Sequence, residues 1–330
     1  MDLNGSYGAA GTGTIPFHYK ENQIRDIQIG IIGAGTMGMR VINSLKAHPA
    51  FSVTGVYDPD VEAQARVRAL DPALPIFGSA AELSVQPGLD ALYIASPPVW
   101  HLEHLRLAQD AGVAVLCEKP LAASLDDVAA IERLVLPFCA VNFPFACVPA
   151  VRQLQRIVSS GALGEYSGAT VTLRFAQWPR AWQSGAADWL GMPEQGGFTR
   201  EVLSHFLFLA LRLFGPLELS TYHLEREPGK TETALKAQLR HHCGALVIDA
   251  AVGGTIADSN CFEWRGTRGN ARLHDWYRLD ATGVPEIAPV DPTSHTLDAF
   301  ARAFREQADT GLATLSEARQ VAELVEVLLA

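Results

Sequence analysis

Short apolar runs alternate with helix-like segments between Ile27 and Asn142, and this alternation constrains the fold more than any other feature. The apolar runs read IQIGIIG, FSVTGVYD, ALYIASPP, VAVLCEKP and CAVNF. Segments whose apolar residues have helical spacing separate them, among them VEAQARVRAL and WHLEHLRLAQDAG. Buried strands that alternate with helices form βαβ units around a parallel sheet. The sequence therefore predicts an α/β domain in this region.

The second half of the chain has a different pattern. The runs SGATVTLRFAQW, ETALKAQLRHH and GALVIDAAVGGT are longer and partly alternating, which is typical of an antiparallel sheet with one covered face. Helix-like segments flank these runs. We therefore expect a flexible arm over residues 1–25, a parallel-sheet domain over residues 26–143, and an α+β domain with an open, mostly antiparallel sheet over residues 144–330.

The first apolar run is followed by Gly33-Ala34-Gly35-Thr36-Met37-Gly38, which fits G-x-G-x-x-G and opens a helix. In a Rossmann domain these glycines permit a tight turn, the close approach of a pyrophosphate and the packing of helix on strand, and the phosphates lie at the helix N-terminus. A structural turn without a ligand remains the alternative. The similar stretch GAAGTGT at Gly8–Thr14 has neither a strand before it nor a helix after it, so it reads as a linker.

Asp58 lies at the end of the second predicted strand, about 20 residues beyond the last glycine of the motif. An acid at this place binds both hydroxyls of the adenine ribose. Its charge also repels a 2′-phosphate, so the sequence favours NAD over NADP as cofactor.

Two further loops follow predicted strands at their carboxyl ends. One contains Ser96-Pro97-Pro98 and the other Glu118-Lys119-Pro120. Ligands of open α/β sheets bind outside the carboxyl ends of the strands, so both loops should face the same crevice as the glycine motif. Lys119 could there exchange a proton as hydride moves. Taken alone, Glu118 and Lys119 would more often form a surface ion pair.

The order and spacing of G-x-G-x-x-G, S-P-P-V-W-H and E-K-P resemble the glucose–fructose oxidoreductase/inositol dehydrogenase (Gfo/Idh/MocA) family. The resemblance runs from about Ile27 to the C-terminus. It implies a Rossmann domain followed by a domain whose open sheet serves in oligomerisation, here as a homodimer or homotetramer. It also implies that Lys119 is catalytic, that Glu118 lies by the nicotinamide, and that His101 lies near the cofactor loop.

The family's acid–histidine pair on a second-domain helix maps to Glu201 and His205. Residues four apart share one helical face, so these two side chains should project together. His205 would act as acid or base toward a substrate hydroxyl or carbonyl, with Lys119 sharing the proton. A buried histidine bonded to a nearby carboxylate is the structural alternative.

Three positions depart from the family pattern. The acid before the histidine is Glu201 instead of Asp, an acid after it is replaced by Phe208, and the usual N-x-R-F reads Asn142-Phe143-Pro144-Phe145. These changes make a standard sugar substrate less secure and leave room for a less polar carbonyl compound or a cyclic imine.

Asn142, Trp178 and Arg200 are further candidates for substrate contacts. An indole can stack on a sugar ring, but Trp178 can equally cover the sheet or an interface, and an ion-paired role is the more usual one for Arg200. No metal site is expected. His101 and His104 lack a third ligand at a useful spacing, and His241 and His242 should point to opposite faces of a strand.

Composition excludes several classes of partner. The net charge is −10 with no basic cluster, which argues against nucleic acid and anionic membranes. No apolar run is long enough for a membrane span, and no secretory signal is visible. The five cysteines include no C-x-x-C pair, which favours a reduced, cytoplasmic protein.

These patterns together predict an NAD(P)-dependent oxidoreductase, with NAD preferred, that transfers hydride between nicotinamide and a carbonyl or alcohol carbon of a small sugar- or polyol-like substrate. Three alternatives stay open: a reductase of less polar carbonyls or cyclic imines, an NAD-dependent glycosidase on the same scaffold, and a non-catalytic protein that senses NAD or a sugar.

Overall fold

The computed structural model describes residues 25–255 and 257–330. The expected arm over residues 1–25 lies, apart from Arg25, outside this described part, and so does the glycine-rich stretch at residues 8–14.

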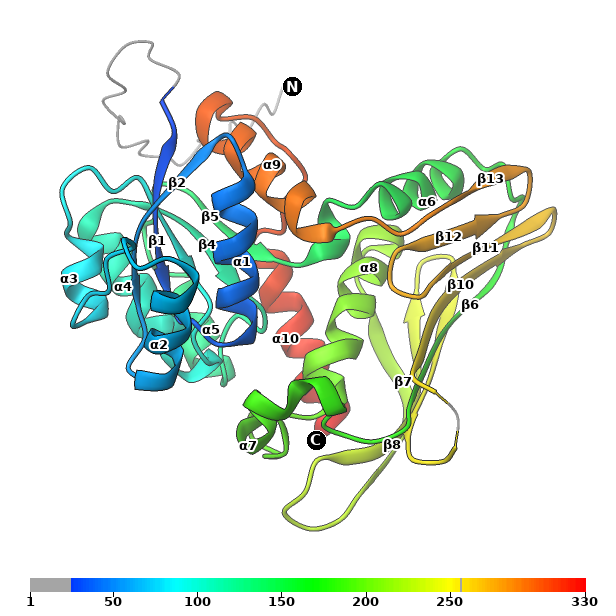
Figure 1. The fold of residues 1–330 in the computed structure, drawn as a ribbon. Coiled ribbons are helices and arrows are strands. Elements are labelled where there is room, and N and C mark those ends of the chain that lie inside the picture. Colours follow the sequence, from blue (N-terminus) through cyan, green and yellow to red (C-terminus); the bar gives the residue numbers. More distant parts are fainter. Residues whose placement is uncertain (1–24, 256) are drawn as a thin grey trace, which may run out of the picture.

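The first domain is built on a parallel sheet of five strands in the order β2-β1-β3-β4-β5, as predicted. In Figure 1, α1 and α9 lie on one face of this sheet and α3, α4 and α5 on the other. The elements in chain order are β1 (Ile27–Ile32), α1 (Thr36–Ala47), β2 (Phe51–Tyr57), α2 (Val61–Leu70), α3 (Ala80–Ser84), β3 (Ala91–Ile94), η1 (Pro98–Trp100), α4 (His101–Ala111), β4 (Ala114–Glu118), α5 (Leu125–Ile131) and β5 (Cys139–Asn142).

The second domain contains a sheet of eight strands in the order β13-β12-β11-β10-β6-β9-β8-β7. All neighbours are antiparallel except β6 and β9, which confirms the mostly antiparallel prediction. The strands are β6 (Tyr166–Phe175), β7 (Glu218–Arg226), β8 (Glu232–His241), β9 (Gly244–Val252), β10 (Ser259–Gly266), β11 (Gly269–His274), β12 (Arg278–Ala281) and β13 (Val284–Ile287).

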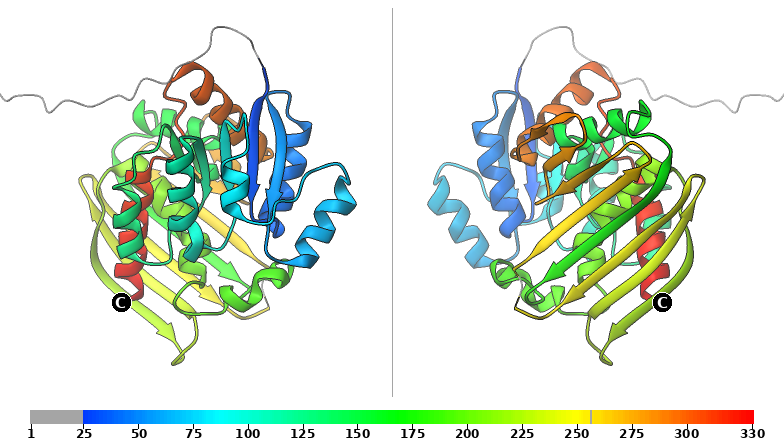
Figure 2. Two further views of the ribbon diagram at one scale, coloured as in Figure 1. Left: turned by 90° about the vertical axis from the view of Figure 1, so that its left-hand side faces the viewer. Right: turned by 90° about the vertical axis from the view of Figure 1, so that its right-hand side faces the viewer.

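One face of this second sheet is covered and the other is open. Along β8, Leu235 and Leu239 are fully buried, whereas Lys236 and Arg240 are exposed, the alternation expected of a half-covered strand. Helices lie on the face toward the first domain (Figure 1), and the opposite face lies open in the right-hand view of Figure 2. The helical elements of this half are η2 (Pro144–Ala146), α6 (Pro149–Ser159), η3 (Ala181–Ala186), α7 (Ala187–Leu190), η4 (Thr199–Leu203), α8 (Ser204–Phe214), α9 (Pro292–Glu306) and α10 (Leu315–Leu329).

The last two helices tie the domains together. The ring of Phe300 in α9 lies 6.3 Å from that of Phe51 and 5.5 Å from that of Phe138, both in the first domain. Val141 of β5 forms a β-bridge with Ala313, just before α10. The strands of the two sheets lie within residues 27–142 and 166–287, while α9 and α10 return to the first domain, and α10 packs against both β5 and α8.

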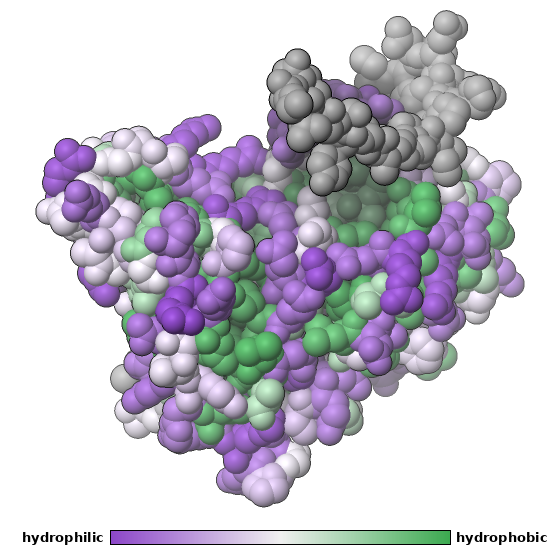
Figure 3. Space-filling view, turned by 180° about the vertical axis from the view of Figure 1, so that it is seen from behind, coloured by the Kyte–Doolittle hydropathy of each residue, from purple (hydrophilic) through white to green (hydrophobic). Residues whose placement is uncertain are grey.

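The surface gives few hints of a partner. Seen from behind, it is a mosaic of hydrophilic and hydrophobic side chains, with apolar patches near the middle (Figure 3). Among the described helices, none is long and apolar enough to cross a membrane.

Candidate active site

The glycine motif forms an open cradle between β1 and α1. Gly33 has a φ of +97°, and a Cβ there would meet the backbone of Ala95 at 2.6 Å; a Cβ on Gly38 would lie 2.0 Å from the Gly33 carbonyl oxygen. A Cβ on Gly35 would meet nothing within 4 Å. Two glycines are therefore required by packing, while the third borders open space of the kind that a pyrophosphate needs.

Helix α1 starts at this cradle, and no acidic side chain of its own occupies its N-terminus. Its N-cap Gly35 makes no side-chain cap, and the first turn, which begins with Thr36 and Met37, contains no acidic residue. The N–H groups of a first helical turn lack intrahelical acceptors and attract anions. These residues fit the phosphates of a dinucleotide.

Asp58 follows β2 and faces the cradle. One carboxylate oxygen accepts the N–H of Ala34 at 2.6 Å, and the other accepts the N–H of Asp60 at 2.8 Å. An ionised carboxylate has about four acceptor positions, so each oxygen can accept a ribose hydroxyl as well.

A buried network of polar side chains joins the carboxyl ends of β3, β4 and β5. The Tyr93 hydroxyl donates to Glu118, and Asn142 Nδ2 donates to Glu118 Oε1 at 2.9 Å and to the Tyr93 oxygen at 2.9 Å. Burial raises the pKa of Glu118, and these hydrogen bonds oppose the rise. Asn142 Oδ1 is buried without a partner among the described residues.

Lys119 reaches across to the second domain. Its Nζ donates to Glu201 Oε2 at 2.8 Å and to the Glu201 backbone oxygen at 3.0 Å. Both side chains are only 12% exposed. This pair joins the end of β4 to η4, and its partial burial makes it stronger than a surface ion pair.

Glu201 lies on η4, a short π-helical segment that runs into α8. The start of η4 is held by buried Glu232, whose Oε1 accepts the N–H of Thr199 at 2.6 Å. The sequence placed Glu201 beside His205, but Glu201 pairs with Lys119, and within the described part of the chain no hydrogen bond joins Glu201 to His205. The wider π turn (i→i+5) changes the geometry that an α-helix would give to residues four apart.

His205 is buried at the start of α8, and its Nδ1 has no partner in the described part of the chain. Burial lowers its pKa well below the ordinary value, and the charges of Lys119 and Arg180 lower that pKa further. The imidazole is therefore neutral at neutral pH.

Aromatic rings enclose His205. Those of Phe143, Phe145 and Trp276 lie 5.9, 5.8 and 5.6 Å from the imidazole. Phe143 also stacks on Phe208 at 4.7 Å. Phe208, which stands where the family often has an acid, thus adds a ring behind Phe143 to this apolar wall instead of a charge.

The Ser96–Pro97 loop is held in place by histidines. His101, fully buried, places Nε2 2.8 Å from the Ser96 carbonyl oxygen and Nδ1 3.1 Å from the Leu121 carbonyl oxygen. The Ser96 hydroxyl lies 2.9 Å from His104 Nδ1. His101 therefore braces the loops that follow β3 and β4.

Four of the five N–H donors of Arg200 are already engaged within the protein. Its Nε and Nη2 donate to the carboxylate of Glu326 at 3.0 and 2.9 Å, and its Nη1 donates to the carbonyl oxygens of Pro193 and Gly196. The side chain connects the start of η4 to α10. The geometry favours the ion-paired role that the sequence left open.

Three side chains that the sequence analysis passed over contribute to this region: Tyr93, Arg180 and Trp276. Tyr93 could have been noticed as a hydroxyl in an otherwise aliphatic buried strand, which needs a partner. Trp276 lies in the turn between β11 and β12 and has a φ of +69°. Arg180 lies beside Trp178, with its Cζ atom 5.7 Å from the centroid of the indole ring. Nothing local in the sequence relates these last two to His205.

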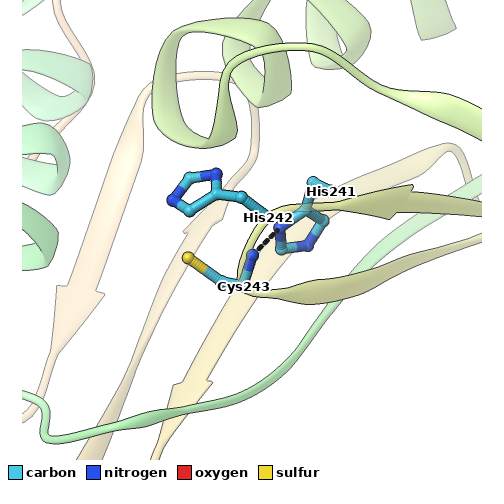
Figure 4. Close-up of side chains that lie close together, drawn as sticks. All are labelled: His241, His242 and Cys243. Carbon is cyan, nitrogen blue, oxygen red and sulfur yellow. Dashed lines mark hydrogen bonds between the residues drawn. The ribbon is translucent and has the colours of Figure 1, made fainter.

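The hairpin between β8 and β9 holds a separate cluster, His241, His242 and Cys243 (Figure 4). The expectation that the histidines point to opposite faces of a strand was wrong, because β8 ends at His241 and His242 begins the turn. One potential ligand atom from each residue lies within 4.8 Å of the others. Both nitrogens of His241 already have neighbours, the Cys243 N–H at 3.3 Å and the Tyr166 hydroxyl at 3.1 Å.

An open glycine cradle on a parallel sheet, linked by Lys119 and Glu201 to a second domain with an open sheet, defines a class: two-domain proteins with an NAD(P)-binding Rossmann fold. The family model described as "Oxidoreductase family, NAD-binding Rossmann fold" matches residues 27–135. The chain belongs to this family, Gfo/Idh/MocA.

Individual relatives support the assignment. A D-apiose dehydrogenase of Paraburkholderia graminis is 31% identical over 286 residues, which cover 78% of this chain and 72% of that protein. An inositol 2-dehydrogenase of Corynebacterium glutamicum is 29% identical over 146 residues, and the match spans only 43% of each chain. The structure of an oxidoreductase from Thermotoga maritima has the same fold, with a TM-score of 0.78 at 19% identity over 92% of this chain and 96% of that one.

Proposed function

We propose that the chain is an NAD-dependent dehydrogenase that oxidises an alcohol carbon of a small sugar- or polyol-like substrate. The observation that carries the proposal is the pairing of Lys119 Nζ with Glu201 Oε2 at 2.8 Å beside a buried, neutral His205. These three side chains could donate or accept a proton at the carboxyl edge of the parallel sheet, where a dinucleotide would bind.

The residues present fit the cofactor. Gly35 borders open space, the first turn of α1 offers N–H groups, and the unpartnered Asn142 Oδ1 can accept an N–H from the nicotinamide carboxamide. When bound, NAD would take up the hydride that leaves the substrate carbon.

The protein's own groups then handle the proton. A neutral imidazole can accept the hydroxyl proton of an alcohol, which a protonated one cannot. Lys119 carries three donors, two of which bind Glu201, and the third can bind the same substrate oxygen. Glu201 keeps the ammonium in position, and the aromatic wall around His205 excludes water from the proton transfer.

Net formation of NADH with a panel of sugars and polyols tests this function. An NAD-dependent glycosidase would cleave its substrate without net NADH, and a sensor would bind NAD without turnover. NADH consumption with ketones or cyclic imines, with no oxidation of any alcohol, would instead establish a reductase of less polar substrates.

Asp58 is proposed to select NAD. Asp58→Ser removes the carboxylate that would accept hydrogen bonds from the ribose hydroxyls. NAD should then bind roughly 10- to 100-fold more weakly, which is the affinity that a hydrogen bond to a charged group contributes. NADP should bind no worse, because the repulsion of its 2′-phosphate is lost. Titration of the protein with each cofactor measures both changes.

Asp60→Ser is a matched control for this variant. Asp60 caps α2 through the N–H groups of Glu62 and Ala63, and serine preserves such a cap. If both variants lost the same NAD affinity, the loss would come from removing a negative charge near the site, and the proposed bond between Asp58 and the ribose hydroxyls would be contradicted.

We also propose that the chain forms a homodimer or homotetramer through the open face of the second sheet and works in the cytoplasm. The uncovered face of β6, β8 and β9 supports the first point, and five unpaired cysteines support the second. Sedimentation velocity should give two or four times the chain mass of 35.6 kDa; a monomer would contradict the oligomer.

A further inference from the structure

A guanidinium group lies among aromatic rings next to the proposed active site. The Cζ atom of Arg180 is 5.9, 5.7, 4.7 and 5.9 Å from the ring centroids of Phe175, Trp178, Trp182 and Trp276. Trp276 in turn contacts the imidazole of His205 edge-on at 5.6 Å. The aromatic cage, defined as these four rings, thus connects Arg180 directly to the wall around His205.

The orientation of this guanidinium is fixed from one side. Buried Gln183 accepts two hydrogen bonds at its Oε1, from Arg180 Nε at 3.0 Å and from the Arg180 backbone N–H at 3.2 Å. Within the described side chains, no acceptor is bonded to either terminal nitrogen, Nη1 or Nη2. Gln183 therefore fixes the Nε side of the Arg180 guanidinium, and the N–H groups on Nη1 and Nη2 can bind a ligand.

The charge of Arg180 is not neutralised by a bonded carboxylate in this described region. Glu201 already binds Lys119 at 2.8 Å. Exposed Asp258 uses one oxygen for the N–H of Ala176. Both acids favour the cationic form of Arg180 from a distance, and burial opposes it by lowering its pKa, yet an arginine stays charged in proteins. His205 adds no negative charge.

We propose that Arg180 binds the carboxylate of the substrate, so that the enzyme acts on a sugar acid or another polyol that carries a carboxylate. This inference rests on the proposed dehydrogenase function. Two terminal N–H groups of one guanidinium match the two oxygens of a carboxylate. Trp178 and Trp276, both partly exposed, border this guanidinium and can contact the C–H groups of a sugar ring. Because no carboxylate among the described residues is bonded to Arg180, its one positive charge can balance a monoanion such as a carboxylate, whereas it would balance only half of the charge of a phosphate dianion.

Binding to the full chain saturated with NAD tests the proposal by calorimetry. The probes are matched pairs that differ only in the acid group: D-glucuronate with D-glucose, and D-galacturonate with D-galactose. The acid of at least one pair should bind more tightly than its neutral partner. Arg180→Gln should weaken binding of that acid roughly 10- to 100-fold and leave the neutral sugar unchanged. Arg180→Lys, which keeps the charge without the planar fork, should lose less.

Arg106→Gln is the control, because Arg106 is exposed on α4 of the first domain, away from the aromatic cage and from the open face of the second sheet. Equal binding of acids and neutral sugars by the native protein, or an unchanged acid affinity in both Arg180 variants, would overturn the proposal. Tighter binding of glucose 6-phosphate than of glucuronate would overturn the assignment to a carboxylate.

The outcomes also separate this inference from the proposed function. If neutral sugars yield NADH and Arg180→Gln has no effect, the carboxylate site is wrong and the dehydrogenase function stands. If the acids bind through Arg180 but no probe yields NADH, the anion site stands and the dehydrogenase function fails.

Discussion

Replacing Lys119 by methionine should lower the turnover of an oxidised substrate by roughly 10²- to 10⁴-fold, the usual contribution of a positioned acid or base. Methionine retains much of the length of the side chain but removes the ammonium, which binds Glu201 and is proposed to bind the substrate oxygen. NAD affinity should stay close to the native value, because the cradle at Gly33–Gly38 is untouched. Steady-state rates together with an NAD titration measure the two effects separately.

Lys230→Met provides the matched control. Lys230 pairs with Glu227 in an exposed turn, and the two side chains are 69% and 68% exposed. This variant should keep native turnover. Native turnover in Lys119→Met, with a substrate that the unaltered protein oxidises, would remove Lys119 from the mechanism.

The sequence could predict those parts of the site that depend on local pattern. The apolar run before Gly33 and the helix after it identify β1 and α1, and the short spacing to Asp58 places an acid at the end of β2. Side chains at the carboxyl ends of parallel strands in one sheet lie along one edge, which is why the sequence places Glu118 and Lys119 on the same side of the sheet as the cradle.

The partners of those side chains could not be read from spacing, because they come from distant segments. Lys119 and Glu201 are 82 positions apart, and their contact depends on how α10 fixes η4 against the first domain. We expected Glu201 beside His205 because residues four apart share one face of an α-helix. Glu201 lies in the π-helical turn η4, whose hydrogen bonds run from i to i+5, so α-helical spacing does not apply there. Trp276 reaches His205 from the β11–β12 turn, and Arg180, just before η3, lies over the Trp276 ring.

A second large effect is expected at His205. His205→Asn should lower kcat/KM roughly 10²- to 10⁴-fold, since asparagine can bond to a substrate oxygen but cannot take up its proton. The pH dependence gives a sharper test. Burial together with the charges of Lys119 and Arg180 lowers the pKa of His205 well below 6.5, so the neutral, active form persists as the pH falls through 6.5. The acid limb of the native kcat/KM profile should therefore begin below pH 6.5.

His223→Asn is the control, because His223 is 69% exposed at β7 and should leave the profile unchanged. The residual activity of Lys119→Met gives an internal check on the cause of the shift. With one of the two cations removed, the pKa of His205 rises and the acid limb must move toward higher pH. An acid limb at or above pH 6.5 in the native enzyme, or one that stays in place when Lys119 is neutralised, would mean that the group titrating in catalysis is not this buried imidazole.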